Sequence, residues 1–452
     1  MPGGRRDMLS SGLPSLESSS GRTPLTEAAP HHVVIVGAGF GGLAVCHGLA
    51  GAASRWGLRI TIVDQRNHHL FQPLLYQVGT AVLATSEIAW PIRHLVRRRK
   101  EVTTLLAVVN GIDLEGRNVL FEDGAAVHFD SLVLATGARH AYFGHDEWEP
   151  YAPGLKTLED ATSIRRRILL SLERAERETD PERRAALLTF VIVGGGPTGV
   201  ELAGAIAELA HQNLREDFRS IDTRKARVLL IEAGPRILSS FTPDLSAYAQ
   251  AALERLGVEI ELGLAVTDCN DHAVTYGSRV VAADVILWAA GVRASPAAAW
   301  LGMPADKAGR MKVEPDLSVP GHPEIFVIGD TATINAWHGN PVPGIAPAAK
   351  QMGLHVAQTI KRRLAADTRS RPFRYRNAGN LATIGKRSAV IDFGWIKIRG
   401  RLAWWIWGLA HIYFLIGLRN RLAVALSWLW IYATGSRSAC LITQVDHRQK
   451  SR

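Results

Sequence analysis

Two repeats of a strand, a glycine-rich loop, a helix and a second strand predict an α/β protein with two Rossmann-like dinucleotide-binding domains. An apolar, tryptophan-rich segment near the end of the chain predicts an additional helical region, which we expect to associate with a membrane. The chain has 452 residues, which is enough for two or three packed domains, since single cores rarely grow beyond about 250–300 residues.

Composition places the chain among globular proteins. Hydrophobic residues make up 47% and charged residues 21%, and the mean hydropathy of +0.04 excludes both a disordered chain and a polytopic membrane protein. The net charge of +10 favours an anionic partner, either nucleic acid or an anionic lipid surface. The basic residues are scattered, with a local cluster at 97–100, and no nucleic-acid-binding module is recognisable. We therefore expect no nucleic-acid partner.

The cysteines and the N-terminal segment indicate the cellular setting. Cys46, Cys269 and Cys440 are far apart and form neither a CxxC pair nor a zinc-binding pattern, so we expect a reduced cytosolic setting and no metal site. The same spacing argues against dithiol redox chemistry. Residues 1–30 are rich in Ser, Gly and Pro and lack the apolar core of a signal peptide, which predicts a flexible tail.

The first repeat spans residues 32–64. An apolar strand leads into a GxGxxG loop at Gly37, Gly39 and Gly42, a helix is expected over the next dozen residues, and a second strand ends at Asp64. In such a loop the first glycine permits the tight turn, the second lets the backbone approach a pyrophosphate, and the third permits close packing of helix on strand. The helix N-terminus offers amide donors to phosphate, and Asp64 is suited to a ribose diol.

The second repeat spans residues 188–232 and has the same order, with an alanine-rich helix expected from 200 to about 214 and Glu232 at the end of its second strand. A carboxylate there suits a ribose 2′-hydroxyl and repels a 2′-phosphate, so we expect NADH to be preferred over NADPH. Arg236 lies nearby and keeps accommodation of a phosphate open. Two dinucleotide sites on one chain indicate hydride transfer between a nicotinamide and a bound flavin.

Further apolar strands end in small residues, where the chain can approach a ligand. These strands fall in 132–137, 285–291 and 325–330.

Together with the two glycine loops and the stretch Phe71-Gln72-Pro73-Leu74-Leu75-Tyr76-Gln77-Val78, these segments resemble type II NADH:quinone oxidoreductases. The resemblance extends from about residue 31 to 442. It implies FAD-dependent oxidation of NADH with two-electron reduction of a membrane quinone and no proton pumping. It also implies a homodimer attached peripherally to the cytoplasmic face of the inner membrane.

The resemblance further implies a division of the chain: a discontinuous FAD-binding domain at 31–155 and 306–371, an NADH-binding domain at 156–305, and a C-terminal region at 372–452. The residues implied to bind FAD, which is expected to be tightly bound, are Gly37, Gly39, Phe40, Gly42, Asp64, Gln72, Thr136, Gly137, Gly329, Asp330 and Ala346. Those implied to bind NADH are Gly194, Gly196, Thr198, Gly199, Glu232, Ala290 and Gly291.

Three residues are candidates for catalysis. Members of the family often carry an AQxxxQ-like segment at the quinone site, but here Pro347 stands where the first Gln is often found. Lys350 and Gln351 are therefore the expected substitutes for quinone hydrogen bonding. Glu201 follows the second glycine loop, and a role in substrate binding or proton relay stands beside the alternative of an acid that stabilises the helix dipole. For His68 and His69 we expect ordinary loop packing.

The C-terminal region holds six of the twelve tryptophans. Residues 403–418 carry no Lys, Arg, Asp or Glu, Arg419-Asn420-Arg421 interrupts the apolar run, and 422–434 is apolar again. One continuous span would place two arginines inside the bilayer, at about 2.5–3.5 kcal/mol each, so we expect two interfacial helices instead. The basic residues expected to meet anionic headgroups are Arg399, Arg401, Arg419, Arg421 and Arg437. The alternative is a soluble dimer interface or a cap over the core.

Two other functions stay open at this stage. A soluble NAD(P)H-dependent flavoprotein reductase of a protein acceptor leaves the aromatic C-terminal region unexplained. An NADH-sensing flavoprotein differs from both enzymes by the absence of turnover with a quinone.

Overall fold

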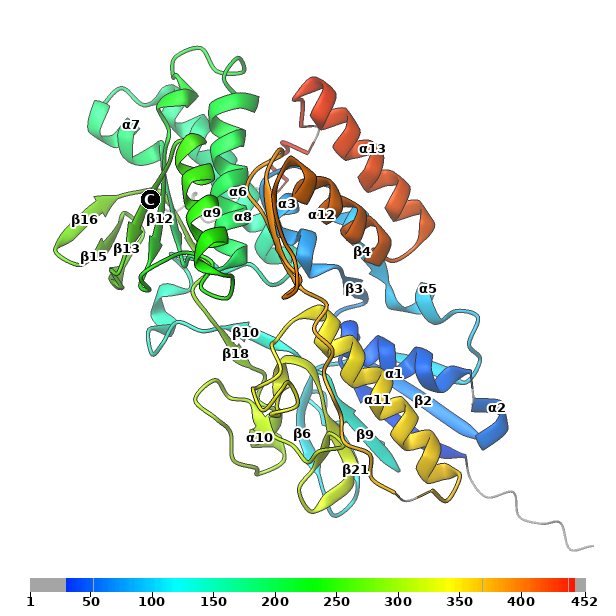
Figure 1. Ribbon diagram of the computed structural model, residues 1–452. Helices are drawn as coiled ribbons and strands as arrows, with labels where there is room; N and C mark the ends of the chain where they lie inside the picture. Colours follow the sequence, from blue (N-terminus) through cyan, green and yellow to red (C-terminus); the bar gives the residue numbers. More distant parts are fainter. Residues whose placement is uncertain (1–29, 52, 368, 438, 444–452) are drawn as a thin grey trace, which may run out of the picture.

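The computed structural model describes residues 30–443 except residues 52, 368 and 438. Apart from residue 30, the segment for which the sequence predicts a flexible tail lies outside the described part. Two α/β units lie side by side, and two C-terminal helices pack beside their junction (Figure 1). The predicted α/β class is confirmed, whereas the exact domain boundaries stay a prediction.

The first unit is built on a six-stranded sheet with the order β20-β21-β9-β1-β2-β5. Its central strand β1 is almost wholly buried, as the run His-His-Val-Val-Ile-Val predicts, and pairs in parallel with β2 and β9. Helices α1 and α11 pack against each other on this unit. The elements are β1 (His31–Val36), α1 (Phe40–Ala50), β2 (Leu58–Asp64), β5 (Val102–Leu106), β9 (Ser131–Leu134), β20 (Ser318–Val319), β21 (His322–Val327) and α11 (Ala346–Leu364).

The second unit repeats this design in a four-stranded parallel sheet, β13-β12-β11-β17. Its helix α8 begins at Pro197 and gives way at Leu209 to a π-helical turn, so the expected helix from 200 to 214 starts earlier and loses regular form in its last turn. The elements are α6 (Leu158–Arg177), α7 (Pro181–Leu187), β11 (Thr189–Val193), α8 (Pro197–Glu208), β12 (Arg227–Glu232), α9 (Pro243–Arg255), β13 (Val258–Leu262) and β17 (Val285–Trp288).

Smaller elements connect the two sheets or lie on their flanks. Two antiparallel meanders are β6 (Val109–Asp113), β7 (Asn118–Phe121), β8 (Ala126–His128), and β14 (Val266–Cys269), β15 (Ala273–Tyr276), β16 (Arg279–Ala282). The other short elements are α2 (Ala53–Trp56), β3 (His68–Leu70), α3 (Leu75–Gly79), α4 (Thr85–Ile88), β4 (Ala89–Pro91), α5 (Ile92–Val96), β10 (Ala138–His140), β18 (Val292–Ala294), α10 (Ala297–Trp300), β19 (Met311–Lys312) and β22 (Ala332–Thr333).

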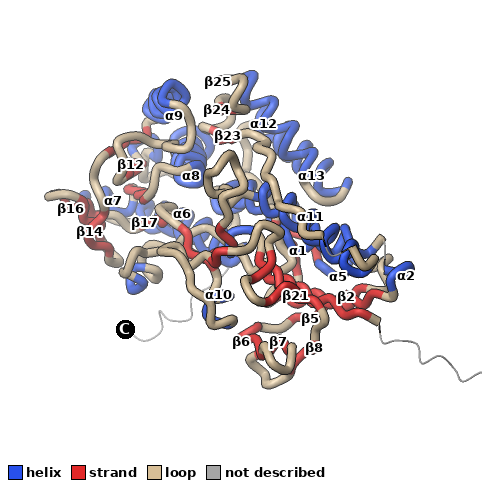
Figure 2. The backbone as a smooth tube through the Cα atoms, turned by 60° about the horizontal axis from the view of Figure 1, so that its bottom comes forward, coloured by secondary structure: helices blue, strands red, loops and turns tan. Residues whose placement is uncertain are grey.

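The C-terminal region comprises a three-stranded sheet and two helices. The sheet lies between α8 and α9 on one side and α12 on the other (Figure 2). The break between the helices lies at 415–417, where Gly417 has a positive φ of 82°, and not at Arg419-Asn420-Arg421, which forms the first turn of the second helix. The elements are β23 (Asn380–Thr383), β24 (Ala389–Asp392), β25 (Lys397–Gly400), α12 (Arg401–Phe414) and α13 (Leu418–Thr434).

Neither α12 nor α13, nor any other helix within residues 30–443, is long and apolar enough to cross a membrane.

Trp407 is the main anchor of α12. Its ring is 1% exposed and lies 4.1 Å from the ring of His411 and 5.3 Å from that of Trp428 on α13. We expect Trp407→Ala to lower the free energy of unfolding by about 3–5 kcal/mol, because removing the indole leaves a cavity between the helices. Urea unfolding followed by fluorescence measures this, and Trp395→Ala, at a side chain that is 85% exposed, is the control expected to leave stability nearly unchanged.

Candidate functional site

The first glycine loop connects β1 to α1 at the point where the strand order reverses, which is where open α/β sheets bind their ligands. Gly37 has a φ of 101°, and its N–H donates to the carbonyl of Val63 at 2.8 Å. A Cβ on Gly42 would fall onto the carbonyl oxygen of Gly37, so only glycine permits this approach of helix to strand. A Cβ on Gly39 would meet no atom within 4 Å, which leaves its side of the loop open.

A cleft that encloses about 1180 Å³, including its open mouth, lies beside this loop. The loops after β1, β2 and β9 line it, together with the turn that follows β21 and the first turn of α11. Of the residues for which the sequence implies FAD binding, only Gly42 does not line the cleft, because it packs against the backbone of Gly37 instead. The residues that line it are Gly37, Gly39, Phe40, Asp64, Gln72, Thr136, Gly137, Gly329, Asp330 and Ala346.

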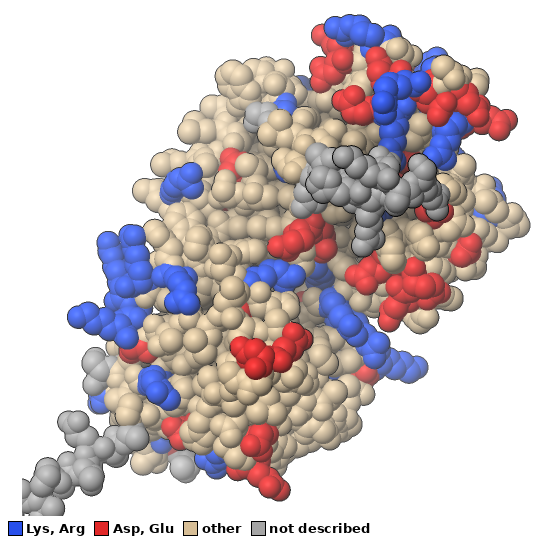
Figure 3. Space-filling model, turned by 180° about the vertical axis from the view of Figure 1, so that it is seen from behind, with Lys and Arg blue, Asp and Glu red and all other residues tan. Residues whose placement is uncertain are grey.

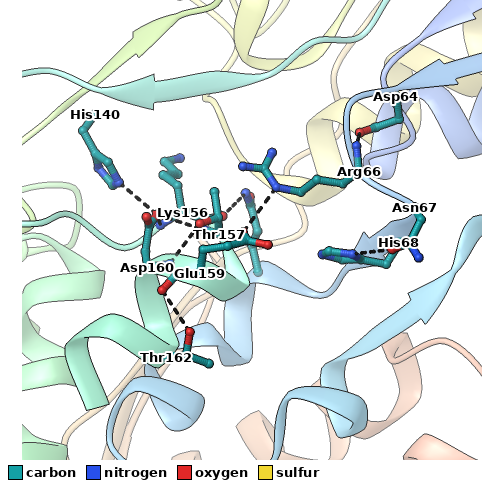
Figure 4. A network of polar contacts seen from close by, with 11 residues as sticks. Asp64, Arg66, Asn67, His68, His140, Lys156, Thr157, Glu159, Asp160 and Thr162 are labelled. Atoms are coloured by element: carbon teal, nitrogen blue, oxygen red, sulfur yellow. Dashed lines mark hydrogen bonds and ion pairs between the residues drawn. The ribbon is translucent and has the colours of Figure 1, made fainter. Parts of the chain in front are cut away.

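A polar network at the mouth of the cleft joins the first sheet to the start of α6 (Figure 4). Arg66 Nε lies 3.4 Å from the carboxylate of Glu159. Asp160 accepts from the backbone N–H groups of Lys156 and Thr157, both at 2.9 Å, and lies 3.4 Å from Nε2 of His140. The network therefore holds the guanidinium of Arg66 and the backbone of Lys156, and both residues line the cleft.

The residues of the cleft fit a flavin dinucleotide. The carboxylate of Asp64 accepts from the N–H of Ala38 at 2.7 Å and from that of Arg66 at 2.8 Å, and retains lone pairs for ribose hydroxyls. Burial raises the pKa of Asp64, an effect that hydroxyl donors would offset. Nε2 of His68 is buried without a partner among the described residues, and α11 begins at the cleft without a side-chain cap. The cleft thus offers polar groups for a ligand to satisfy.

The second glycine loop, between β11 and α8, is built in the same way. A Cβ on Gly199 would fall onto the carbonyl oxygen of Gly194, whereas one on Gly196 would meet nothing within 4 Å. Glu232 accepts from the N–H of Gly195 at 2.5 Å and from that of Gly234 at 2.7 Å. The loop therefore presents an open glycine and a fixed carboxylate, as a site for NADH requires.

Arg236 is already engaged within the same unit. Its guanidinium donates to the carbonyls of Phe241 at 2.7 Å and Ser239 at 2.9 Å. A 2′-phosphate would have to compete with these bonds, so the structure gives no support to Arg236 as a phosphate ligand.

A two-stranded ribbon connects the loop after β9, at Gly137, with the loop after β17, at Gly291. β10 follows the loop at Gly137, β18 follows the loop at Gly291, and the two strands pair antiparallel. The N–H of Ser295 donates to the carbonyl of Gly137 at 3.0 Å, and that of Ala141 to the carbonyl of Gly291 at 3.2 Å. The loop at Gly137, which lines the first cleft, and the loop at Gly291, at the end of β17, are therefore neighbours in space. Two further residues are expected to bind NADH: Thr198 lies at the start of α8, and Ala290 precedes Gly291 in the loop after β17.

A separate chamber holds Glu201. The chamber spans about 600 Å³, including the part that is open to solvent, and lies between α3, α8, the turn after β23, and the helices α12 and α13. The carboxylate of Glu201 accepts from the N–H of Thr383 at 3.4 Å, and burial raises its pKa to about 8. Glu201 is the fifth residue of α8 rather than a residue of its first turn, so a simple helix-dipole role fits it poorly.

One wall of the chamber is a chain of polar contacts. Trp428 Nε1 donates to Oε1 of Gln77 at 2.7 Å, Nε2 of Gln77 donates to the hydroxyl of Tyr76 at 2.9 Å, and that hydroxyl lies 2.9 Å from Oγ1 of Thr383. Burial raises the pKa of Tyr76 far above its usual range, so its hydroxyl keeps its proton.

The structure does not bring Lys350 and Gln351 to Glu201. The side-chain amide of Gln351 donates to the carbonyl of Arg376 at 2.9 Å and accepts from its N–H at 3.0 Å, so both of its polar groups are used. Lys350 is exposed, with its Nζ 5.9 Å from the ring of Phe414 at the end of α12. Their expected role as quinone ligands stays a prediction, and for Gln351 it requires that two hydrogen bonds break.

The sequence does not reveal the contacts of two buried residues at the chamber. Glu208 and Arg437 are both buried and lie 4.0 Å apart. Arg437 was expected to meet lipid headgroups; this is wrong, because its guanidinium donates to the carbonyl of Thr80 at 2.7 Å inside the protein. No local pattern signals these contacts, since their partners lie far away in sequence. His69 packs as expected: it is buried, donates to the carbonyl of Ala38 at 2.8 Å, and burial lowers its pKa to about 4.

Comparison with known proteins adds independent evidence. Residues 31–353 match the family model described as pyridine nucleotide-disulphide oxidoreductase, and residues 377–435 match that of the NDH2 C-terminal domain. The chain is 42% identical over 427 residues, 91% of its length and 90% of the relative's, to a type II NADH:quinone oxidoreductase, Ndh, of Mycobacterium tuberculosis. A second protein of that organism so described, NdhA, is 40% identical, with 94% and 92% covered.

Among solved structures, NDH2 from Plasmodium falciparum in complex with NADH superposes with a TM-score of 0.83. The two chains are 20% identical, and the match covers 90% of this chain and 99% of the other. This likeness shows the fold that the two chains share.

Proposed function

The chain belongs to the family of type II NADH:quinone oxidoreductases, and from this membership we propose how its residues carry out the reaction. It oxidises NADH and reduces a quinone by two electrons, without pumping protons. FAD, when bound, supplies the two-electron carrier between the two substrates. The membership selects this enzyme over the protein-acceptor reductase and the NADH sensor that the sequence alone leaves open.

The observation that carries the proposal is the ribbon formed by β10 and β18, which joins the loop at Gly137 to the loop at Gly291. A nicotinamide held at Gly291 and an isoalloxazine ring held near Gly137 would be neighbours, and hydride transfer needs positioning and exclusion of water above all. We assign the ribose diol of FAD to Asp64 and its ribityl chain to Asp330. The positive end of α11 at Ala346 favours negative charge in the cleft.

NADH, one proton and a quinone give NAD⁺ and a quinol, and in our proposal Glu201 gives that one proton, which solvent then restores. A carboxyl with a pKa of about 8 retains its proton at neutral pH and is suited to give it to a reduced quinone oxygen. The bonds among Thr383, Tyr76, Gln77 and Trp428 hold the surrounding wall in place. Quinone would enter between this wall and the membrane.

A single cuvette experiment tests this function. The purified protein is expected to show an oxidised-flavin spectrum, to lose it when NADH is added without oxygen, and to recover it when a short-chain quinone follows. A protein whose flavin NADH bleaches but no quinone restores would instead be a sensor.

Glu232 determines the choice between the two nicotinamide cofactors. We expect Glu232→Ala to lower the preference for NADH over NADPH by about tenfold or more, because the variant no longer repels a 2′-phosphate and no longer holds a 2′-hydroxyl. The ratio of kcat/KM for the two cofactors measures the effect. Glu261→Ala, at a surface carboxylate paired with Arg279, serves as the control. An unchanged ratio in Glu232→Ala would show that the carboxylate does not read the ribose.

We also propose that α12 and α13 attach the protein peripherally to an anionic membrane at its cytoplasmic face. One side of each helix packs inward, yet the other side carries large apolar side chains that are about half or more exposed to solvent, which is costly without a partner. Seen from behind, this end of the molecule is a surface with few charged side chains, and a group of Lys and Arg side chains lies beside it (Figure 3). The exposed apolar residues are Leu402, Trp405, Leu409, Tyr413, Phe414, Leu418, Leu422, Leu426, Leu429 and Trp430.

The basic residues near this face support the same proposal. Arg399, Arg401 and Arg419 are exposed, and Arg421 is partly exposed while its Nε donates to the carbonyl of Leu415 at 2.8 Å. Three cysteines without a disulfide suit a reduced compartment. A homodimer stays a proposal that rests on the resemblance alone.

Substitution of the outer apolar face tests the attachment. The double variant Trp405→Ser/Leu426→Ser is expected to float with phosphatidylglycerol-containing liposomes about fivefold less than the unmodified protein, because both side chains are more than half exposed and would insert into the interface. Val280→Ser, at an exposed valine on β16 in the second unit, is the matched control. Equal flotation of all three proteins would exclude this face as the membrane contact.

A further inference from the structure

The segment that follows α13 returns into the protein, and Arg437 in it lies beside α8. Arg437 in this segment is buried, and its guanidinium donates to the carbonyl of Thr80, after α3, at 2.7 Å and to that of Ala205, on α8, at 3.4 Å. Its charge faces Glu208, with Nη2 and Oε2 4.0 Å apart. Asn213 also donates to the carbonyl of Gly435, so the segment is held at two points.

This arrangement is costly unless every group has its partner. An arginine and a glutamate inside a protein lose their hydration, and removal of one leaves the other as an unpaired buried charge. The planar guanidinium donates to two carbonyls and lies beside a carboxylate, which the single ammonium of a lysine does not do equally well, while its Nε is buried without a partner among the described residues. The sequence therefore places at position 437 a side chain whose shape suits a junction of three segments.

Glu208 connects this junction to the catalytic chamber. Its Oε1 accepts from the N–H of Lys386 at 2.7 Å, while Glu201, seven residues earlier on α8, accepts from the N–H of Thr383 at 3.4 Å. Two carboxylates of one helix thus hold the two ends of the 383–386 turn. Gly385 inside this turn packs so closely on Glu208 that a Cβ would collide with the carboxylate.

We propose that Arg437 is a positioning residue for quinone reduction: it holds Glu208, and through Glu208 the 383–386 turn, in the geometry that sets the environment of the Glu201 carboxyl. This inference rests on the proposed function of Glu201. It assigns to the end of the chain a role in proton delivery, in addition to the attachment of α12 and α13.

The titratable groups around Glu201 and Glu208 come from several of the segments that line the chamber. Tyr76 on α3 lies near both carboxyls, and Glu208 also faces Lys386 and Arg387 in the turn after β23. Arg437 in the C-terminal segment faces Glu208, Tyr76 and Cys440. Loss of Arg437 removes the cation that offsets Glu208. The unpaired negative charge on Glu208 and the weaker bond from the Thr383 N–H in the freed turn both raise the proton affinity of Glu201.

The test separates the two half-reactions in the full-length, FAD-loaded enzyme. For Arg437→Met we expect flavin bleaching by NADH within about twofold of the unmodified rate, because the variant does not touch the nicotinamide site. Turnover with a short-chain quinone is expected to be at least about tenfold lower, and its alkaline limb to move to higher pH by about one unit. Arg437→Lys, which retains the charge, is expected to restore the limb. Arg224→Met, at an exposed arginine paired with Asp222, is the control.

Unchanged turnover and an unchanged limb in Arg437→Met with full flavin content would overturn the inference. If that variant does not fold, Glu208→Ala/Arg437→Met, which removes both buried charges and the acceptor of the Lys386 N–H, is measured in the same way. Quinone turnover at least about tenfold lower is expected because the turn is freed, and unchanged turnover would again overturn the inference. If the unmodified protein itself shows no quinone turnover or no alkaline limb, the proposed function fails instead, so the two failures are distinguishable.

Discussion

Gly42→Val is expected to yield a folded but colourless protein, with less than about a tenth of the flavin that the unmodified chain retains. The side chain would fall onto the carbonyl oxygen of Gly37, a backbone atom that cannot rotate away, so the loop beside the cleft must open. The flavin-to-protein absorbance ratio after gel filtration measures this, and circular dichroism checks that the fold persists.

The matched control is Gly51→Val at the end of the same helix. Gly51 has an ordinary φ of −67°, and a Cβ there meets nothing within 4 Å. We expect its flavin content to equal that of the unmodified protein. If Gly42→Val retained its colour, the first glycine loop would not be the FAD site, and the assignment of the whole cleft would fall with it.

Glu201→Gln is expected to lower quinone turnover by about 100-fold while NADH still bleaches the flavin, because the amide fills the same space but gives up no proton. Burial raises the pKa of this carboxyl from 4.5 to about 8. The proton is therefore present below pH 8 and lost above it, so turnover of the unmodified enzyme should fall as pH rises through about 8. Steady-state rates from pH 6 to 10 with a saturating quinone measure this limb.

The limb should be absent from the residual activity of Glu201→Gln. Glu254→Gln, at an exposed glutamate on α9, is the control and should retain both the rate and the limb. A limb that persists unchanged in Glu201→Gln would assign the titration to another group.

Much of the first cleft can be predicted from the sequence, because its residues belong to local patterns. Gly37 and Gly39 follow a buried strand, Asp64 ends the next one, and Asp330 lies in the turn after β21, a strand that returns to the same sheet. In a parallel sheet the carboxyl ends of all strands face one edge, so such residues meet without any knowledge of side-chain packing. Their ligand contacts stay a prediction, but their proximity follows from topology.

The Glu201 chamber follows no such rule. Its walls come from α3, α8, the turn after β23 and the C-terminal helices, which meet only through tertiary packing. Gln351 fits a family motif, but its amide bonds to the backbone of Arg376, a partner that no spacing reveals. Arg437 resembles a lipid-facing cation in sequence because it follows the apolar run at 422–434, and only the path of the chain shows that it is buried.

The hydrogen bonds of α13 also bear on how such proteins can be recombined. Trp428 bonds to Gln77, and Ser427 donates to the carboxylate of Glu87 at 2.5 Å, so the outer helix is fastened to the segment that contains α3 and α4. A chimera that exchanges only residues 372–452 with those of a relative would separate these donors from their acceptors. The C-terminal region also bonds to α8 and to Asn213 after it, so about 71–91, about 197–213 and the C-terminal region must be inherited together.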